Sequence, residues 1–307
     1  MTQPTNQFDR RRFLVAAAAS TVTAPLIAPG RISAQAPDES VHKICVFTKP
    51  FNSLSFDELA DRIAELGFDG IEAPIRKGGH IETEAIADEL PELVDALKKR
   101  DLEITLVTSD INDPNDPLTT KFLRTLGTLG IKRYRLKYLH YDFAIPVNDQ
   151  LANWKTQLRD LAALNHDYGV QGLYQNHAGA KNMGAALWDL RQVLDGISTD
   201  DLAVAYDIRH AVAEAANCWP VNFQMIRPHI GMVYVKDFQW IDQKVQNVPL
   251  GEGRVEERFF EMLRDSGFDG PISLHEEYLD HKNPQLVPDH LSAIKKDLAT
   301  LRSWLKS

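Results

Sequence analysis

Cysteine is scarce in this chain, which has only Cys45 and Cys218 among 307 residues. Two cysteines are too few for the disulfide framework that holds many small secreted domains together. Cys45 lies in an apolar stretch, where a buried free thiol is the expected state. A disulfide between the two in an oxidising compartment remains the alternative.

Positive charge is also in short supply. Lys and Arg number 34 against 43 Asp and Glu, which gives a formal net charge of -9. Residues 1–36 hold four arginines and one aspartate, so their removal would bring the net charge to -12. Nucleic-acid binding draws its affinity from clustered Lys and Arg. The acidic balance therefore argues against a nucleic-acid partner.

A glycine-rich nucleotide loop is lacking as well. Gly251 and Gly253 in Leu-Gly-Glu-Gly have the spacing of a phosphate cradle. They do not stand between a strand and a helix, which such a cradle requires, so a plain turn is expected. The sequence predicts no nucleotide cofactor.

Long apolar runs are missing too. The stretch from Leu14 to Ile27 is shorter than the roughly twenty residues that a membrane helix needs. It follows Arg10-Arg11-Arg12-Phe13-Leu14, which matches the twin-arginine export pattern R-R-x-F-L. Ala34-Gln35-Ala36 offers a small-residue cleavage site, although Pro37 directly after it is unfavourable.

We therefore expect residues 1–36 to be a twin-arginine-type signal peptide, with a disordered basic tail as the alternative. Residues 37–307 would then form a periplasmic or otherwise extracytoplasmic protein with no stable membrane span. Their length of about 270 residues suits one α/β barrel or two smaller domains.

Two hydrophobic periods alternate from Lys43 onward. Short runs rich in Val, Ile, Leu, Phe or Tyr predict strands at 43–48, 70–75, 103–108, 133–138, 171–176, 202–207, 230–236 and 271–276. Apolar residues at helical spacing predict helices that begin after Ser55 and then cover 83–99, 117–128, 149–167, 185–195, 220–227, 256–266 and 286–305. Eight strand and helix pairs predict a single (β/α)8 TIM barrel, with an open doubly wound sheet as runner-up.

Polar clusters close several of the predicted strands. They are Tyr174-Gln175-Asn176-His177, Tyr206-Asp207-Ile208-Arg209-His210, Tyr234-Val235-Lys236-Asp237 and Leu274-His275-Glu276-Glu277. Functional groups of a (β/α)8 barrel project from the C-terminal ends of its strands. Any one of these residues is more often a structural hydrogen-bonding group, but their convergence predicts an active site.

These motifs resemble those of the xylose isomerase-like TIM barrels, a superfamily of sugar isomerases and epimerases, inosose dehydratases and type IV endonucleases. The resemblance covers the mature chain. It depends on the order and spacing of Gly67-Phe68-Asp69-Gly70-Ile71-Glu72, Gln175-Asn176-His177, Asp207-Ile208-Arg209-His210, Val235-Lys236-Asp237 and Leu250-Gly251-Glu252-Gly253.

The resemblance implies a divalent metal (Mn, Mg, Co or Zn) held by Glu, Asp, His and Glu after strands five to eight. This chain keeps only the Asp, at Asp207, while Gln175, Tyr234 and His275 or Glu277 stand at the other positions. Gln removes a negative charge that a hard cation favours. Metal ligation by Gln175, Asp207 and His275 therefore stays open against a metal-free barrel in which Asp207 pairs with His210.

The same substitutions bear on catalysis. Family epimerases take two bases from the glutamates after strands five and eight, and Gln175 cannot act as a base. One-base proton abstraction next to a carbonyl remains open. The catalytic candidates are Glu277, Lys236, His177 and Glu72, with His275 as a further possible base. Lys236 would be an enediolate clamp, a base, or a structural partner of Asp237.

Arg76, Lys137, Trp240 and His210 are the candidates for substrate binding. A guanidinium can hold a carboxylate in two hydrogen bonds, and an aromatic ring can stack on a sugar. The sequence thus predicts an exported sugar isomerase or epimerase-like enzyme with a small carbohydrate substrate. A keto-sugar or keto-glycoside lyase or dehydratase, and an inactive sugar-binding barrel, remain alternatives. A homo-oligomer is also open.

Overall fold

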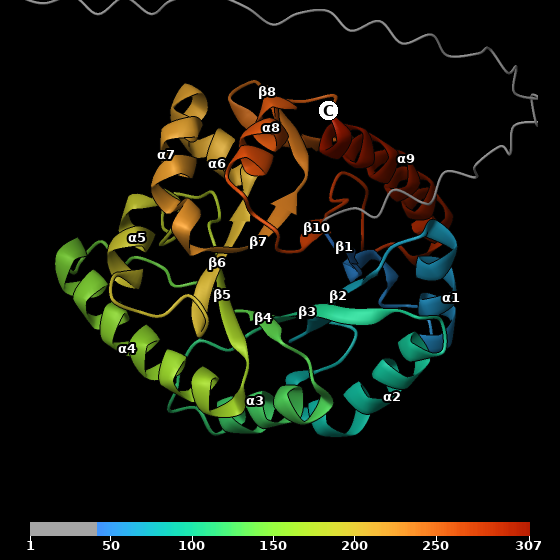
Figure 1. Ribbon diagram of the computed structural model, residues 1–307, viewed down its shortest axis with the longest axis horizontal. Coiled ribbons are helices and arrows are strands. Elements are labelled where there is room, and N and C mark those ends of the chain that lie inside the picture. The colour runs from blue at the N-terminus through green and yellow to red at the C-terminus, as the bar shows by residue number, and fades with distance from the viewer. Residues whose placement is uncertain (1–41) are drawn as a thin grey trace, which may run out of the picture. The chain divides into compact units, whose positions relative to one another are not determined.

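The computed structural model describes residues 42–307. They contain a closed barrel of eight parallel strands in the order β1-β10-β7-β6-β5-β4-β3-β2 (Figure 1). The strands are β1 (Ile44–Phe47), β2 (Gly70–Ile75), β3 (Glu103–Ser109), β4 (Arg133–Arg135), β5 (Gln171–Gln175), β6 (Leu202–Asp207), β7 (Ile230–Val235) and β10 (Ile272–Leu274). Because β1 pairs with both β2 and β10, the sheet has no free edge. The predicted (β/α)8 barrel is confirmed, and the open sheet is excluded.

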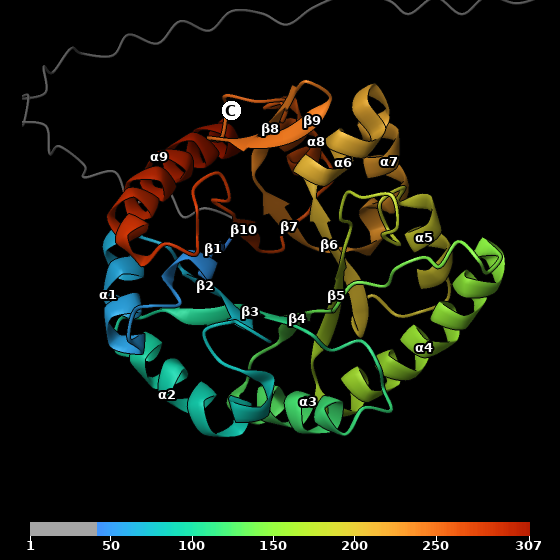
Figure 2. The same cartoon turned by 180° about the vertical axis from the view of Figure 1, so that it is seen from behind.

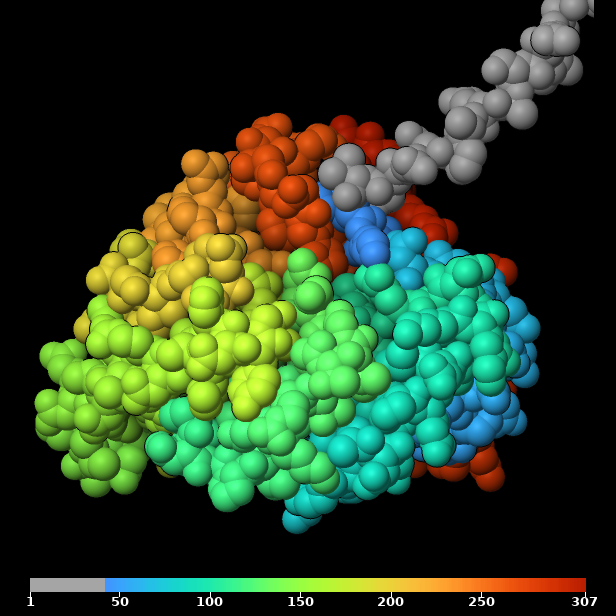
Figure 3. Space-filling view, turned by 60° about the horizontal axis from the view of Figure 1, so that its bottom comes forward, coloured from blue at the N-terminus to red at the C-terminus, as the bar shows by residue number. Residues whose placement is uncertain are grey.

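Helices form a ring around the barrel in Figure 1. They are α1 (Phe56–Leu66), α2 (Ile86–Lys98), α3 (Pro117–Leu129), α4 (Val147–Tyr168), α5 (Trp188–Leu194), α6 (Ile208–Ala215), α7 (Trp219–Ile226), α8 (Arg258–Asp265) and α9 (Val287–Lys306). The ring closes where α9 meets α1, and Arg302 donates a hydrogen bond to the carbonyl of Gly67 there. The blue and red ends of the described chain lie side by side in Figure 3.

Helix α1 begins and ends where the sequence predicts. The Ser55 hydroxyl accepts a hydrogen bond from the Glu58 backbone, and the Glu58 carboxylate accepts one from the Ser55 backbone. This capping box satisfies amides that have no partner inside the helix. Gly67 ends the helix with φ 80°, a left-handed conformation that glycine adopts without steric cost.

The barrel interior holds its own small apolar cluster. It consists of Cys45, Leu106, Leu173, Ala203, Ala205, Met232 and Tyr234. Cys45 is buried and Cys218 is exposed, and both are free thiols. The predicted buried thiol is therefore confirmed, and the alternative disulfide is absent from the structure.

Two elements differ from the predictions. An antiparallel hairpin of β8 (Asp237–Ile241) and β9 (Lys244–Val248) follows β7, and Figure 2 shows it at the rim between α6 and α9. Its turn residues Asp242 and Gln243 both have positive φ. Such turns usually carry Asn-Gly or Asp-Gly, so the usual sequence signal is missing. Helix α6 was also not predicted, because it begins directly after β6 with no intervening loop.

Among residues 42–307, no helix is both long and apolar enough to cross a membrane. The predicted signal peptide, residues 1–36, lies outside the described residues, so its assignment stays a prediction.

Candidate active site

A cavity of about 160 Å³ opens at the C-terminal ends of the barrel strands. Seven of the predicted site residues line it: Glu72, Arg76, Gln175, His177, Lys236, His275 and Glu277. Asp207 and His210 contact this set from the start of α6. Lys137 and Trp240 do not line the cavity, and Trp240 is 46% exposed. The remaining lining residues are Phe47, Lys49, Thr108, Arg135 and Tyr138.

Lys236 places a buried ammonium between two carboxylates. Its Nζ lies 2.9 Å from Glu277 Oε2 and 3.2 Å from Asp207 Oδ2. Burial opposes the charged form, but these two carboxylates outweigh it and raise the pKa of Lys236. Lys236 therefore stays protonated, which favours a fixed positive charge over a proton acceptor. It does not pair with Asp237, whose carboxylate accepts hydrogen bonds from the backbone of Gly251 and its neighbours.

Asp207 is held by several donors at once. Its carboxylate caps α6 through the backbone N–H of His210 at 3.1 Å, and it accepts a hydrogen bond from Gln175 Nε2 at 2.8 Å. The Gln175 carbonyl oxygen in turn accepts a hydrogen bond from the Tyr138 hydroxyl. Two hydrogen bonds between the Asn176 side chain and the Asp207 backbone fix the ends of β5 and β6 together. These residues form a rigid network rather than free donors.

Glu72 and His275 form a second buried pair. Glu72 Oε2 lies 2.8 Å from His275 Nε2 and 2.7 Å from the Ser273 hydroxyl, and Thr108 donates to the other oxygen. Burial alone would raise the pKa of Glu72, but His275 and the two hydroxyl groups lower it. Glu72 is therefore an anion that orients His275. The Nδ1 of His275 is buried without a hydrogen-bond partner in the described residues.

Two further imidazoles lie in contact, with the ring centroids of His177 and His210 3.9 Å apart. His177 Nδ1 lies 2.8 Å from the Ala178 carbonyl, which can only accept, so Nδ1 carries the proton and Nε2 is left as a proton acceptor. Burial and the nearby Lys236 charge lower the pKa of His177. The same two causes, in the same order, lower the pKa of His210 well below its usual value. Both rings are neutral near pH 7.

The residues present do not fit a divalent ion. Lys236 Nζ stands between Asp207 and Glu277, so an ammonium holds the position where a cation would meet both carboxylates. Gln175 bonds to Asp207, and His275 bonds to Glu72 instead of joining them. Residues 42–307 contain no group of three or more His, Cys, Asp or Glu side chains placed to hold a metal.

Five of the cavity residues were not among the site residues predicted from the sequence: Phe47, Lys49, Thr108, Arg135 and Tyr138. Thr108 binds Glu72, and Arg135, which is 3% exposed, has its guanidinium 4.6 Å from the ring centroid of Tyr138. Lys49 follows β1 and opens a short 3-10 helix, Lys49–Phe51. Arg135 ends β4, whereas the predicted strand ran on to residue 138 and placed this arginine in its interior.

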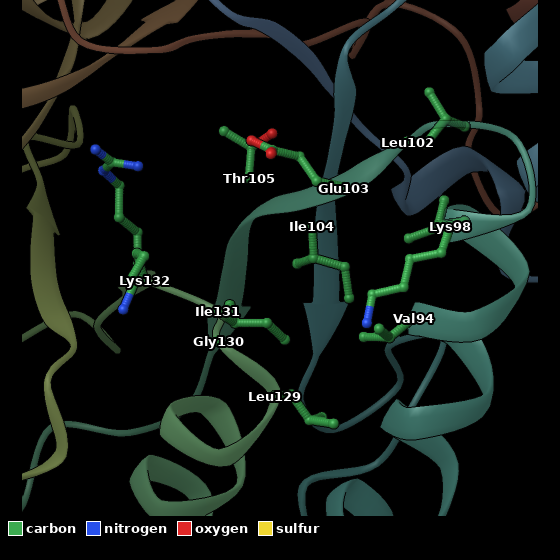
Figure 4. A pocket seen from close by; sticks show the side chains of 12 residues that line it. Val94, Lys98, Leu102, Glu103, Ile104, Thr105, Leu129, Gly130, Ile131 and Lys132 are labelled. Carbon is green, nitrogen blue, oxygen red and sulfur yellow. The ribbon is translucent and has the colours of Figure 1, made fainter.

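A separate cavity of about 220 Å³ lies at the opposite ends of the strands. Figure 4 shows it between the end of α2, the start of β3 and the loop that leads into β4. Its walls are largely apolar side chains such as Val94, Leu102 and Ile104, beside Lys98 and Glu103. Function in a (β/α)8 barrel resides at the other end. We assign no chemistry to this cavity.

The comparisons with known proteins agree with the fold. The chain matches a 3-keto-D-glucoside 4-epimerase from E. coli with a TM-score of 0.65 and 19% identity, over 85% of this chain and 99% of that one. A probable 3-DHS dehydratase from Bacillus anthracis matches with a TM-score of 0.67 and 16% identity, over 85% and 98%. A D-psicose 3-epimerase from Clostridium cellulolyticum H10, solved with D-tagatose, matches with a TM-score of 0.64 and 15% identity, over 86% and 99%.

No curated protein matches the chain significantly. The family model described as xylose isomerase-like TIM barrel matches residues 60–304, which is most of the barrel. This confirms the family that the strand-end motifs predict. The chain belongs to the xylose isomerase-like TIM barrel family, whose members act as sugar isomerases and epimerases and as dehydratases.

Proposed function

We propose that this protein is a carbohydrate isomerase or epimerase-like enzyme that abstracts a proton next to a carbonyl without a metal ion. The observation that carries the proposal is the Lys236 ammonium, held in the cavity wall by Asp207 and Glu277. Relatives of similar fold act on keto-glucosides and ketoses. Their substrates support a carbonyl-bearing sugar here.

His177 is the proton acceptor in this proposal. Its neutral Nε2 takes the proton from the carbon beside the carbonyl, and the electron pair of that C–H bond forms the C=C bond of an enediolate. The carbonyl oxygen gains the negative charge, which the Lys236 ammonium stabilises. Return of the proton to the former carbonyl carbon, with transfer of the hydroxyl proton from the first carbon's oxygen to the enediolate oxygen, moves the C=O bond by one carbon and completes an isomerisation. Glu277 and Asp207 keep Lys236 charged and in place, and Glu72 orients His275 in the same cavity wall.

The arrangement favours an enzyme over a binding protein. Burying an ammonium and two carboxylates is expensive unless the geometry is good, and replacement by apolar side chains often stabilises a fold. A barrel that only bound a sugar would need few such groups. Ionisable groups with strongly shifted pKa values cluster at functional sites, as Lys236, Glu277 and His210 do here.

A lyase or dehydratase is the second candidate, and Gln175 favours it. Epimerisation at one carbon needs a proton acceptor on each face of that carbon, and the amide of Gln175 cannot accept a proton. Elimination needs one base and a donor for the leaving group. His177 and the Tyr138 hydroxyl, which is bonded to Gln175, would supply them. A probable dehydratase is among the structures of similar fold.

Deuterium exchange tests the proposal. The protein is incubated in D2O with a panel of ketoses and 3-keto-glycosides, and NMR follows both solvent exchange and product. Removing the base in His177→Gln should slow exchange by about 10²–10⁴-fold, and removing the clamp in Lys236→Met by about 10²–10³-fold. Lys295→Met, at an exposed site on α9, is the matched control.

The products of the reaction distinguish the candidate functions. An isomer or epimer supports the first candidate, and an unsaturated or dehydrated product supports the second. If the protein binds members of the panel but catalyses no deuterium exchange on any of them, a sugar-binding barrel without catalysis is the candidate that remains.

Export belongs to the proposal as well. The twin-arginine motif at Arg10-Arg11-Arg12 and the apolar stretch after it support transport of the folded barrel out of the cytoplasm. Cell fractionation tests this, with Arg10→Lys/Arg11→Lys as the variant. Retention of the variant inside the cell would support export, and identical fractionation of both forms would overturn it.

A further inference from the structure

We propose that Lys49, Arg76 and Arg135 bind an anionic oxygen group carried by the substrate, a carboxylate or a phosphate ester. The inference rests on the proposed function in one respect only, which is that the anion is attached to a carbohydrate. It specifies the class of substrate beyond that function.

The first support is position. Lys49 follows β1 in a short 3-10 helix, Arg76 follows β2 and Arg135 ends β4, and all three line the cavity that contains Lys236. Lys49 and Arg76 also line a second cavity of about 590 Å³. These two residues therefore border both cavities. A substrate whose carbonyl lies beside Lys236 can reach them with another part of its chain.

The second support is the lack of counter-ions. Lys49, Arg76 and Arg135 form no ion pair with any side chain of residues 42–307. The guanidinium of Arg76 lies 5.9 Å from the ring centroid of Phe47, and that of Arg135 donates only to the Leu136 carbonyl. A buried charge without a partner is costly. Arg135 is buried, and Lys49 and Arg76 are half-buried, so a ligand of opposite charge would offset this cost around the cavity.

The third support is the local balance of charge. The second cavity is lined by four cations, Lys49, Arg76, Lys77 and Lys282, but by only one carboxylate, Asp110. The whole chain, in contrast, carries a net charge of -9. Asp110 accepts a hydrogen bond from the backbone of Lys77 and forms no ion pair with Arg76, and its single charge offsets only part of the four positive charges. The mouth of the site is thus a positive region on an acidic protein, which attracts anions.

The pKa shifts of Lys49 and Arg76 agree with this assignment. Burial lowers the pKa of Lys49, and the charges of Arg76 and Lys236 lower it further. Burial also lowers the pKa of Arg76, and Arg135 adds to the effect. An anion between them would relieve both penalties. A guanidinium fork meets two oxygens of a carboxylate or phosphate at once, which gives direction as well as strength.

The test compares matched ligands by calorimetry on the intact protein. D-fructose is the neutral probe, and D-fructuronate and D-fructose 6-phosphate are its anionic counterparts. The anionic probes should bind at least about tenfold more tightly than D-fructose, and added salt should reduce this preference. Arg76→Met and Lys49→Met should each weaken the anionic probes by about ten- to hundredfold more than D-fructose.

Arg124→Met and Lys295→Met, at exposed positions on α3 and α9, are the controls and should leave the preference unchanged. Thermal unfolding of each variant checks that it is folded. Equal affinity for neutral and anionic probes, no measurable binding of either anionic probe, or a preference that survives both Arg76→Met and Lys49→Met would overturn the inference. Tighter binding of D-fructuronate than of D-fructose 6-phosphate assigns a carboxylate, and the reverse order assigns a phosphate ester.

The two proposals can fail separately. Arg76-dependent binding of D-fructuronate without deuterium exchange would support the anion site and contradict the proposed reaction. Exchange on neutral ketoses with no preference for anionic ones would do the reverse.

Discussion

Lys236 Nζ lies 2.9 Å from Glu277 Oε2 at the C-terminal end of β7. Asp207 completes the contact on the other side at 3.2 Å. A protonated amine thus supplies a fixed positive charge that the protein encodes itself. Lys236 can therefore stabilise negative charge on a substrate oxygen in the cavity, although several residues at the strand ends differ from the metal ligands that the resemblance implies.

Lys236→Met should lower stability as well as activity. The variant leaves Asp207 fully buried without its cation, and breaking a buried pair by removing one partner costs about 3–5 kcal/mol. Urea unfolding measures the change. Lys295→Met, where the lysine is exposed on α9, should change stability by less than about 0.5 kcal/mol. Equal midpoints for the two variants would contradict the assigned pairing.

Removal of metal ions should leave activity unchanged. Lys236 holds the position between Asp207 and Glu277, so a chelator has no ion to extract from it. Proton exchange is measured before and after dialysis against EDTA, with elemental analysis of both samples. Loss of exchange that Mn²⁺ or Mg²⁺ restores would show instead that the site binds a metal.

Activity should fall on the acid side of neutrality. The pKa values of His177 and His210 are lowered from 6.5 in the folded protein. The contribution of these two neutral rings to the free energy of unfolding is therefore complete above pH 6.5, and it is lost as the pH falls from 6.5 toward their pKa values in the folded protein. The rate of exchange between pH 5 and 8 should show one ionisation below 6.5 that His177→Gln abolishes. A profile that keeps this limb in the variant would assign the base elsewhere.

Glu72→Gln should destabilise the barrel and change its acid response. Glu72 accepts hydrogen bonds from Thr108, Ser273 and His275, and an amide offers fewer acceptor sites to them. The expected loss is about 3–5 kcal/mol at pH 7. Because the folded pKa of Glu72 is lowered from 4.5, its contribution is present above pH 4.5 and disappears as the pH falls through the folded value. Unfolding curves from pH 3 to 7 would show a shallower decline in the variant.

Arg76→Met should not destabilise the free protein. The guanidinium is half-buried and has no ion pair in the described chain, so its removal relieves repulsion from Arg135. The melting temperature without ligand should stay the same or rise, whereas the variant should lose the stabilisation that D-fructuronate gives to the unmodified protein. A marked fall in the ligand-free melting temperature would indicate a structural role for Arg76.

The barrel could be predicted because its signals are local and repeated. Apolar runs such as Ile44–Phe47 and caps such as Ser55 and Gly67 act within a few residues, and the eightfold alternation then leaves few topologies. The β8–β9 hairpin was missed because its turn residues, Asp242 and Gln243, are not the usual ones.

The site was predictable as a set of positions but not as a set of contacts. Strand ends marked Lys236, Asp207 and Glu277, but nothing local shows whether Lys236 turns toward Asp237 or toward Asp207. That choice depends on the register of β6 and β7 and on residues far apart in the chain. Arg135 was missed because β4 is only three residues long and its polar end reads as surface.

The join between β7 and the β8–β9 hairpin also defines where the chain tolerates changes in length. The exposed turn at Asp242 and Gln243 lies at the opposite end of the hairpin from Asp237, whose carboxylate accepts hydrogen bonds from four backbone amides between Gly251 and Val255. Added residues at this turn can therefore be accommodated outside the barrel. A single residue inserted after Val235 would reverse the side-chain alternation and turn the ammonium of Lys236 away from the cavity.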